Sequence, residues 1–333
     1  LDWNYRPLDE IRNGWGVRKE TLSDYRINSS ASYKIIDGLK ASALYSFQNG
    51  IYHNQTLNPV ESFFARDLIN TYTQIDPVTK LLTYPVPVGG ILDYTNSKLT
   101  SHNGRFQINL DKKWNLHSLN AIAGTEIRTA KNERSTDRFY GYDDETKLNQ
   151  NNRVNYNVVY PYSYSGSSDR VPNNSLIESG VNNYLSYYTN IGYTYNDRYL
   201  ASFSARKDES NIFGVNSNQK GVPLWSAGLG WIISKESFFK VDAIQYLKLR
   251  GTFGYTGNVN NSLSALLTTN RISSNVFTVP FSAVVNPPNP SLKWEKIKNI
   301  NIGLDFSLVN NRINGSVDYW KKTGLDLLGN STI

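Results

Sequence analysis

The strongest constraint on the fold is an alternation of apolar and polar residues on both sides of Asp37-Gly38. Before this pair, mostly apolar side chains stand at every second position from 27 to 35, and after it they do so from 39 to 47. Successive side chains of a β-strand point to opposite faces, so each segment has one apolar and one polar side. The Asp-Gly pair predicts a two-residue type I′ turn. The segment as a whole therefore predicts a β-hairpin.

The same pattern recurs along the chain and predicts about ten strands. Each is long enough to cross a bilayer when tilted, which takes roughly nine to eleven residues. Short connections alternate with long polar ones. The short ones are predicted at 37–38, 111–116, 196–198, 232–246 and 309–312, and the long ones at about 49–97, 129–182, 209–222 and 257–292. Short turns at one end and long loops at the other are typical of transmembrane β-barrels. We therefore predict an all-β chain whose residues 1–333 form part of one antiparallel outer-membrane barrel domain with long extracellular loops.

The composition agrees with this fold. Hydrophobic residues make up 39% of the chain, and no apolar run is long enough for a helical membrane span. A barrel needs none, because only alternate residues of its strands face lipid. The 23 Tyr and 7 Trp suit the two membrane–water interfaces, although a tyrosine-rich sugar-binding protein would share this feature. The net charge of +7 comes from scattered residues, so we expect no nucleic acid partner.

No local motif indicates catalysis. The three histidines, His53, His102 and His117, are far apart in sequence, and neither a G-x-S-x-G nor an H-E-x-x-H motif is present. The absence of cysteine excludes thiolate metal sites and disulfides. We therefore expect a protein that is not an enzyme and carries no cofactor. Asp143-Asp144-Glu145 could hold Ca²⁺ through its carboxylate oxygens. The favoured interpretation of this run is a solvated acidic loop.

Loop aromatics and acidic residues are the candidate substrate contacts. Aromatic faces stack on sugar rings or peptide side chains, and tyrosine hydroxyls form hydrogen bonds. The alternative is that these side chains pack one loop against another or against a partner. The candidates are Tyr140, Tyr142, Asp143, Asp144, Tyr160, Tyr162 and Tyr164.

Several short runs, in this order along the chain, resemble the SusC/RagA family of TonB-dependent outer-membrane transporters. They are Arg66-Asp67-Leu68-Ile69-Asn70, Tyr140-Gly141-Tyr142-Asp143-Asp144, Tyr195-Asn196-Asp197-Arg198-Tyr199, Pro223-Leu224-Trp225-Ser226-Ala227-Gly228, Leu247-Lys248-Leu249-Arg250-Gly251, Asn289-Pro290-Ser291-Leu292-Lys293-Trp294 and Asp318-Tyr319-Trp320. The resemblance covers most of the chain. It implies about ten strands of a 22-stranded barrel, with the N-terminal plug absent from this chain, which we interpret as an internal piece of a longer protein.

The resemblance also implies a function and partners. It implies TonB-dependent import of oligosaccharides or peptides across the outer membrane of a Gram-negative bacterium, in particular one of the Bacteroidota. The implied partners are a SusD-like surface lipoprotein, TonB acting through a plug, the glycan or peptide substrate, and the lipid and lipopolysaccharide of the outer membrane. Two alternatives stay open: a passive porin or structural barrel, and a soluble carbohydrate-active β protein.

Overall fold

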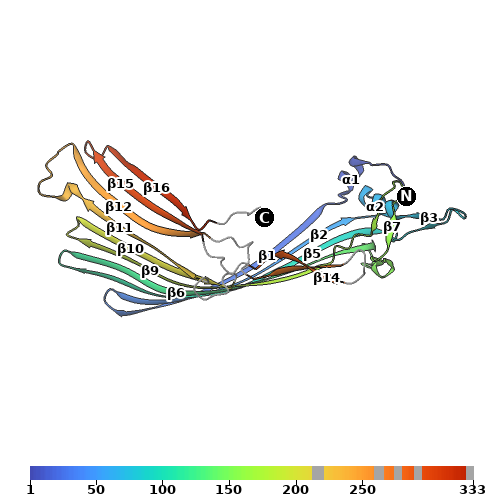
Figure 1. Cartoon of the computed structure of the whole chain (residues 1–333), viewed down its shortest axis with the longest axis horizontal. Helices are drawn as coiled ribbons and strands as arrows, with labels where there is room; N and C mark the ends of the chain where they lie inside the picture. Colours follow the sequence, from blue (N-terminus) through green and yellow to red (C-terminus); the bar gives the residue numbers. More distant parts are fainter. Residues whose placement is uncertain (212–220, 259–265, 274–279, 289–294, 328–333) are drawn as a thin grey trace. The chain divides into compact units, whose positions relative to one another are not determined.

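The computed structural model describes residues 1–211, 221–258, 266–273, 280–288 and 295–327. Ten strands form one sheet in the order β1-β2-β5-β6-β9-β10-β11-β12-β15-β16 (Figure 1). Their bounds are β1 Arg18–Ile36, β2 Leu39–Asn58, β5 Gly90–Trp114, β6 His117–Tyr142, β9 Leu176–Tyr195, β10 Tyr199–Ser210, β11 Gly221–Ile232, β12 Ile244–Asn258, β15 Glu295–Leu308 and β16 Ile313–Leu325. The prediction of about ten strands in one sheet is confirmed.

Smaller elements lie in the connections and before β1. Three two-stranded hairpins are β3 Gln74–Ile75 with β4 Leu82–Thr83, β7 Val159–Pro161 with β8 Ser168–Arg170, and β13 Thr268–Ser273 with β14 Pro280–Asn286. Helices α1 Pro7–Asn13 and α2 Phe63–Tyr72 and the short 3₁₀ turns η1 Asn151–Arg153 and η2 Ile233–Lys235 complete the described elements. Among the described residues, no helix is both long and apolar enough to cross a membrane.

Several strands are longer than the sequence pattern predicted. β2 continues to Asn58 and β5 begins at Gly90, so the connection predicted at 49–97 spans 59–89. The connection predicted at 129–182 likewise spans 143–175. The added strand residues mix apolar and polar side chains on both faces, as at Ile91 and Leu92, and alternation therefore gives no signal for them. The loops predicted at 209–222 and 257–292 lie partly outside the described residues.

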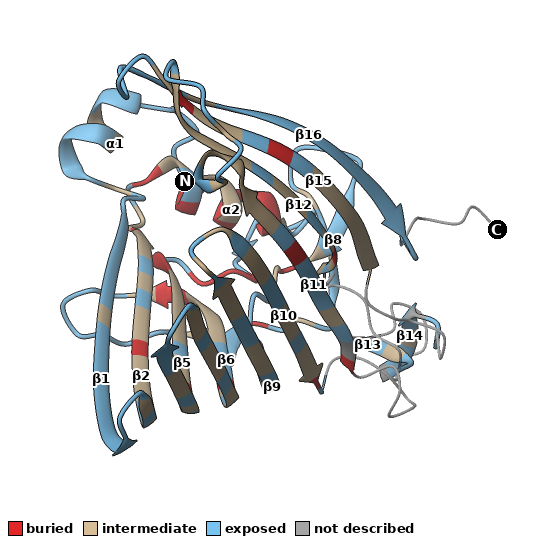
Figure 2. Cartoon of the chain, turned by 90° about the vertical axis from the view of Figure 1, so that its left-hand side faces the viewer, coloured by how far each residue is buried: buried red, intermediate tan, exposed pale blue. Residues whose placement is uncertain are grey.

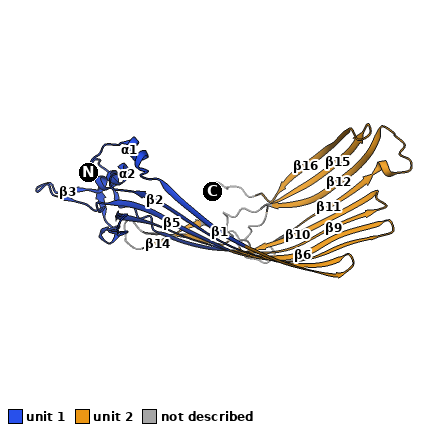
Figure 3. Ribbon diagram, turned by 180° about the vertical axis from the view of Figure 1, so that it is seen from behind, with its two compact units in different colours: residues 1–26, 48–100, 131–181 blue, residues 27–47, 101–130, 182–333 orange. Residues whose placement is uncertain are grey.

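The chain divides into two compact units (Figure 3). Residues 1–26, 48–100 and 131–181 form the first unit, and residues 27–47, 101–130 and 182–333 form the second. The first unit contains both α-helices and the loops 59–89 and 143–175. The second contains the short hairpin turns and all of β10, β11, β12, β15 and β16.

Strand register in the second unit sorts side chains onto two faces. One row of paired residues is Ile191, Phe203, Ala227, Phe253 and Ile300, on β9, β10, β11, β12 and β15 in turn. The adjacent row is Asn190, Ser204, Ser226, Gly254 and Asn299. Paired residues point to the same side of a sheet, and neighbouring rows point to opposite sides. We call these sides the apolar face and the polar face.

The apolar face is not covered by other described parts of the chain. Leu229 is 72% exposed, Phe203 40%, and Ile191 and Leu304 are both 36% exposed. A soluble protein buries a row of this kind, because each large apolar side chain removed from water contributes roughly 1.5–3 kcal/mol. The exposed apolar rows therefore require an apolar medium on that side of the sheet.

The polar face is held by side chains that satisfy one another. The Arg250 guanidinium donates from Nε to Asp305 at 3.2 Å, from Nη1 to Asn301 at 3.1 Å and from Nη2 to Asp318 at 2.9 Å. These contacts join β12, β15 and β16. Gly303 lies directly opposite, where a Cβ atom would come within 2.6 Å of Arg250 Cζ. A larger residue at position 303 would therefore displace the guanidinium from this strand.

The hairpin turns follow the turn residues of the sequence, with one correction. Asn196 and Asp197 both have φ of 52°, as a type I′ turn requires. At Asp37-Gly38 only Gly38 has a positive φ, of 81°. The prediction of a type I′ turn at this position is therefore wrong. The geometry of the turn is set by a neighbour: the Asp111 amide donates to the Gly38 carbonyl at 2.7 Å, and a Cβ at Gly38 would overlap Asp111.

The β11–β12 connection is tied to the neighbouring hairpin by Glu236. This carboxylate accepts hydrogen bonds from Tyr199 Oη at 2.7 Å, Trp231 Nε1 at 3.0 Å and Arg198 Nη1 at 3.1 Å. Tyr199 and Trp231 are paired across β10 and β11 on the apolar face. Amphipathic rings with their polar atoms in a hydrogen-bonded cluster are typical of the edge of an apolar layer.

The same charge should destabilise the protein strongly on the apolar face and only weakly on the polar face. Ile191→Arg places a cation on the apolar face and should cost roughly 2–4 kcal/mol of folding free energy if the site is near the bilayer midplane. Asn190→Arg places it on the polar face and should change stability by less than about 1 kcal/mol. Urea unfolding in lipid vesicles of the protein that contains this chain measures both, and equal losses would contradict the assignment of faces.

Candidate functional site

The most deeply buried side chains of the described chain lie in its loops and at the adjoining ends of β5 and β6, and not along the middle of the sheet. Figure 2 shows this contrast, with β1 and β16 exposed along nearly their whole length and buried residues at α2. The buried apolar cluster consists of Ala65, Ile69, Tyr72, Val86, Ile91, Tyr140, Val154 and Val171, all in the first unit. We call the loops 59–89 and 143–175, with this cluster, the loop module.

Helix α2 contributes one stripe to the cluster. Ala65, Ile69 and Tyr72 are spaced i, i+4 and i+7, which places them on one helix face. Ser62 caps the helix, because its Oγ accepts a hydrogen bond from the Ala65 amide at 3.3 Å. The carboxylate of Glu10 accepts from the Phe63 amide at 2.6 Å, which satisfies a second free amide of the first turn.

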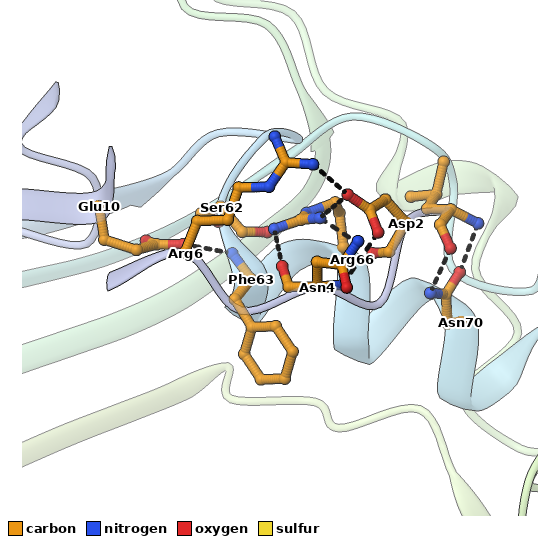
Figure 4. A network of polar contacts seen from close by, with 9 residues as sticks. Asp2, Asn4, Arg6, Glu10, Ser62, Phe63, Arg66 and Asn70 are labelled. Atoms are coloured by element: carbon orange, nitrogen blue, oxygen red, sulfur yellow. Dashed lines mark hydrogen bonds and ion pairs between the residues drawn. The ribbon is translucent and has the colours of Figure 1, made fainter. Parts of the chain in front are cut away.

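Arg66 joins α2 to the segment that precedes α1 (Figure 4). Its guanidinium donates to the carbonyl oxygens of Asp2 and Asn4, both at 3.0 Å, and lies 3.3 Å from the Asp2 carboxylate. Nε donates to the Ser62 carbonyl at 3.3 Å. Arg66 is only 9% exposed. A buried guanidinium is stable here because three carbonyls and one carboxylate replace its water.

Hydrogen bonds join the two loops of the module. The Tyr72 hydroxyl donates to the Arg170 carbonyl at 2.7 Å, and burial raises the pKa of Tyr72 above its ordinary value, so the hydroxyl stays protonated. Ser163 donates from Oγ to the Asn70 carbonyl at 2.6 Å and from its amide to the Thr71 carbonyl at 3.0 Å. The loop that contains α2 and the loop that contains the β7–β8 hairpin thus form one body.

A close approach of backbone at two glycines also joins the end of loop 59–89 to the end of β6. Gly89 has φ of 154° and Gly141 has φ of 58°, and a Cβ atom at Gly89 would come within 2.7 Å of Gly141 Cα. Any larger residue at position 89 would therefore push apart the two backbone segments that meet here. Gly141 is part of the run Tyr140-Gly141-Tyr142 that carries the family resemblance.

The predicted tyrosines have different environments in the loop module. Tyr140 is fully buried and its hydroxyl donates to the Pro172 carbonyl at 2.7 Å. Tyr160 and Tyr162 are half-buried against Tyr72, with ring centroids 6.5 and 5.5 Å away and edge-on. Tyr164 is 61% exposed. Tyr140 therefore supports the module from within, and Tyr164 presents its ring to solvent.

Tyr164 belongs to an exposed aromatic group that sequence reasoning missed in part. Its ring stacks near Tyr162 at 6.4 Å and meets the edge of Trp3 at 5.3 Å with an interplanar angle of 88°. Trp3 is 47% exposed. Trp3 was missed because 160 residues separate it from the tyrosines, and no local pattern signals such a contact.

Tyr142, Asp143 and Asp144 form a turn at the end of β6. Asp143 accepts hydrogen bonds from the amides of Glu145 at 2.9 Å and Thr146 at 2.8 Å, and these bonds hold its pKa below the usual range. Asp144 pairs with Lys147 at 2.7 Å, and Tyr142 donates to Asp144 at 3.4 Å. Both carboxylates are thus already engaged within the turn.

No metal centre is found in the described part of the chain, where no three His, Asp or Glu side chains gather closely enough to hold an ion. The three histidines lie on strands, and each contacts a tyrosine through Nδ1. The pairs are His53 with Tyr94 at 3.2 Å, His102 with Tyr45 at 2.7 Å and His117 with Tyr193 at 2.6 Å.

The fold and the family comparison together define an outer-membrane β-barrel receptor. The family model described as TonB dependent receptor-like, beta-barrel matches residues 2–333, so the chain belongs to this family. The predicted barrel fold and outer-membrane location are thereby confirmed, and the family consists of receptors and transporters, which are not enzymes.

Individual relatives show which TonB-dependent receptors the chain is similar to. The chain is 35% identical to the TonB-dependent receptor SusC of Bacteroides thetaiotaomicron over 161 residues, which cover 46% of this chain and 16% of SusC. It is 29% identical to the TonB-dependent receptor P39 of Formosa agariphila, over 100% of this chain and 29% of that receptor. The resemblance to the SusC/RagA family is confirmed.

The solved structure of the RagAB peptide importer in its open-open state shares the fold. It matches with a TM-score of 0.69 at 20% identity, over 95% of this chain and 31% of that chain. The chain thus spans less than a third of the length of P39 and of the matched RagAB chain.

A cavity made in the core of the loop module should destabilise the module and leave the rest of the sheet unchanged. Ile69→Ala removes a fully buried side chain and should cost roughly 2–5 kcal/mol of the module's stability. Hydrogen–deuterium exchange should rise in residues 63–72 and 160–172 and stay unchanged in β10 and β11. Ile75→Ala, at a 55% exposed position, is the control and should change neither. Exchange that rises equally throughout the sheet would contradict a separate core.

Proposed function

We propose that this chain is the barrel portion of a SusC-like transporter that actively imports oligosaccharides or peptides. The observation that carries the proposal is the division of the sheet into an apolar and a polar face. The rows of paired residues on each face continue without interruption from β9 to β15. In a barrel wall the apolar face meets lipid and the polar face lines a wet lumen. A large polar solute needs such a path to cross a membrane.

The open edges of the sheet support a larger barrel. β1 and β16 each have a partner strand on one side only within the described chain. Unpaired strand edges in lipid are costly, because their amides and carbonyls find no water. We therefore propose that further strands close the wall in the whole protein, and the family resemblance implies a total of 22.

The loop module is the proposed substrate-contact surface. Its hydrophobic cluster and its hydrogen bonds give it a fixed shape, which a binding surface needs. The exposed ring of Tyr164, with Tyr162 and Trp3 beside it, offers aromatic faces to a sugar or an apolar peptide side chain. Tyr160, Tyr142, Asp143 and Asp144 remain proposed contacts at the surface, and the buried Tyr140 holds their surroundings in place.

The partners follow from the same proposal. A SusD-like lipoprotein would close over the loops from outside, and TonB would act through a plug within the wall. The bacterium is a Gram-negative member of the Bacteroidota, which fits the Formosa and Bacteroides relatives. RagAB is described as a peptide importer and SusC as a TonB-dependent receptor. Both glycans and peptides are therefore retained as the proposed substrate classes.

Uptake measurements test the proposal against a passive porin. Deletion of the gene that encodes this chain should abolish growth on one class of oligosaccharide or peptide. Loss of TonB should abolish the same growth, because active import depends on energy transfer. Growth that needs the gene but not TonB would support a passive barrel and overturn active import.

Tyr164 provides the residue-level test of the loop surface. Tyr164→Ala should weaken substrate binding roughly fivefold to tenfold, since stacking of one ring contributes about 1–1.4 kcal/mol. Tyr164→Phe keeps the ring and should retain most of the affinity. Isothermal titration of the purified transporter with the growth substrate measures both variants. Unchanged affinity in Tyr164→Ala would exclude this ring as a contact.

A further inference from the structure

The apolar face changes its chemistry near the loop ends of β15 and β16. On β15, from the turn toward the loop, it presents Leu308, Phe306, Leu304, Ile302 and Ile300, and then Lys298 and Lys296. On β16 it presents Val317 and Tyr319, and then Lys321. Three lysines thus follow directly on an apolar band, on the same face as that band.

An aromatic border marks the level of the change. Trp225, Phe253 and Tyr255 lie on the apolar face of β11 and β12 beside these lysines, with the Trp225 and Tyr255 rings 5.8 Å apart. Tyr255 is paired with Lys298, whose Nζ lies 5.6 Å from the centre of the Phe253 ring. Girdles of aromatic rings bound the apolar band of barrels at the membrane–water interface. The lysines therefore lie at the level of lipid headgroups.

The lysines lie within reach of one ligand. Lys296 and Lys298 are two residues apart on β15, about 7 Å along a strand. Ile300 is paired with Lys321, so Lys298 is the diagonal neighbour of Lys321, at roughly 7–8 Å between backbones. Flexible side chains of this length reach the oxygens of one phosphate group or of two adjacent ones.

The three ammonium groups differ from Arg250 and Lys207 in having no carboxylate partner among the described residues. In the part of the chain that the structure describes, no carboxylate forms an ion pair with Lys296, Lys298 or Lys321. On the polar face Arg250 has two carboxylate partners, and on the apolar face Lys207 of β10 pairs with Glu209 at 2.6 Å. Three cations without a carboxylate partner on a lipid-facing wall favour an anion at the edge of the bilayer.

We propose that Lys296, Lys298 and Lys321 form a binding site for a phosphorylated glycolipid of the outer leaflet, with its acyl chains against the apolar band. The inference rests on the proposed outer-membrane placement, in which the loop ends of the strands face outward. Charge complementarity selects the phosphates, and the continuous apolar rows below the lysines select a ligand with acyl chains. A free phosphate would satisfy only the first of these two features.

Native mass spectrometry of the whole receptor in detergent tests the site. The probes are diphosphorylated lipid A, its monophosphorylated form, and inorganic phosphate. The wild-type protein should bind diphosphorylated lipid A, and the triple variant Lys296→Gln, Lys298→Gln, Lys321→Gln should bind it at least about tenfold more weakly. Monophosphorylated lipid A should bind wild type more weakly, and millimolar phosphate should not displace the diphosphorylated lipid.

Neighbouring positions provide a matched control. Lys322 lies next to Lys321 on the polar face, where it is paired with Asn299. Lys322→Gln should therefore bind lipid A as wild type does. The conservative triple variant with arginine at the three positions should also retain binding, and a heat-modifiable shift on electrophoresis confirms that each variant is folded.

Two results would overturn the site. They are unchanged lipid A binding in the triple glutamine variant, or an equal loss in Lys322→Gln. Displacement by inorganic phosphate would replace the glycolipid by a simple anion and also reject the proposal. The binding assay uses purified protein, so failure of the uptake experiments would leave its outcome readable.

Discussion

The structure depends on one constraint: each long strand must satisfy two different media at the same time. Within the sheet, the backbone of each inner strand pairs with a strand on either side, and side chains alternate between apolar and polar surroundings. The rows through Ile191 and Asn190 are adjacent in register and opposite in chemistry. A shift of one residue in any strand would exchange the two faces, so the alternation specifies the register along the whole sheet.

This constraint explains where the conventional core lies. A single sheet with lipid on one side and water on the other has no interior in which to bury a cluster. The fully buried apolar side chains of the described chain are accordingly found in the loop module, around α2, Val86 and Tyr140. There the loops fold as a small globular body, stabilised by burial, by the Arg66 contacts and by the bonds that link Ser163 and Tyr72 to the opposite loop.

The sequence predicts the sheet well because its signals are local. Two-residue periodicity places the strands, and turn residues such as Asn196-Asp197 place the hairpins. The detail at Gly38 could not be predicted, because its φ and close packing depend on Asp111 of another hairpin. Strand ends were also misplaced where apolar and polar residues are mixed on both faces, as at the end of β2.

The loop module was less predictable for the same reason. A helix in 63–72 has a local signal, in the Ser62 cap and the spacing of Ala65, Ile69 and Tyr72, but ten residues within a long polar connection are a weak basis for an assignment. The separate roles of Tyr140 and Tyr164 have no local signal at all. Both are tyrosines in the same stretch of chain, and only the packing of distant segments buries one and exposes the other.

The lysines of β15 and β16 show what the strand register reveals beyond the alternation of apolar and polar residues in the sequence. In the sequence, Lys296, Lys298, Lys321 and Lys322 are four similar cations near strand ends. The pairing of Ile300 with Lys321, and of Asn299 with Lys322, separates them, three onto the apolar face and one onto the polar face. A cation on a lipid-facing wall is tolerated only where it reaches the headgroups, since its cost falls from about 2–4 kcal/mol at the midplane to about 0–1 at the interface. The position of these three lysines, directly beyond the aromatic border, therefore marks the outer limit of the apolar band from the protein side.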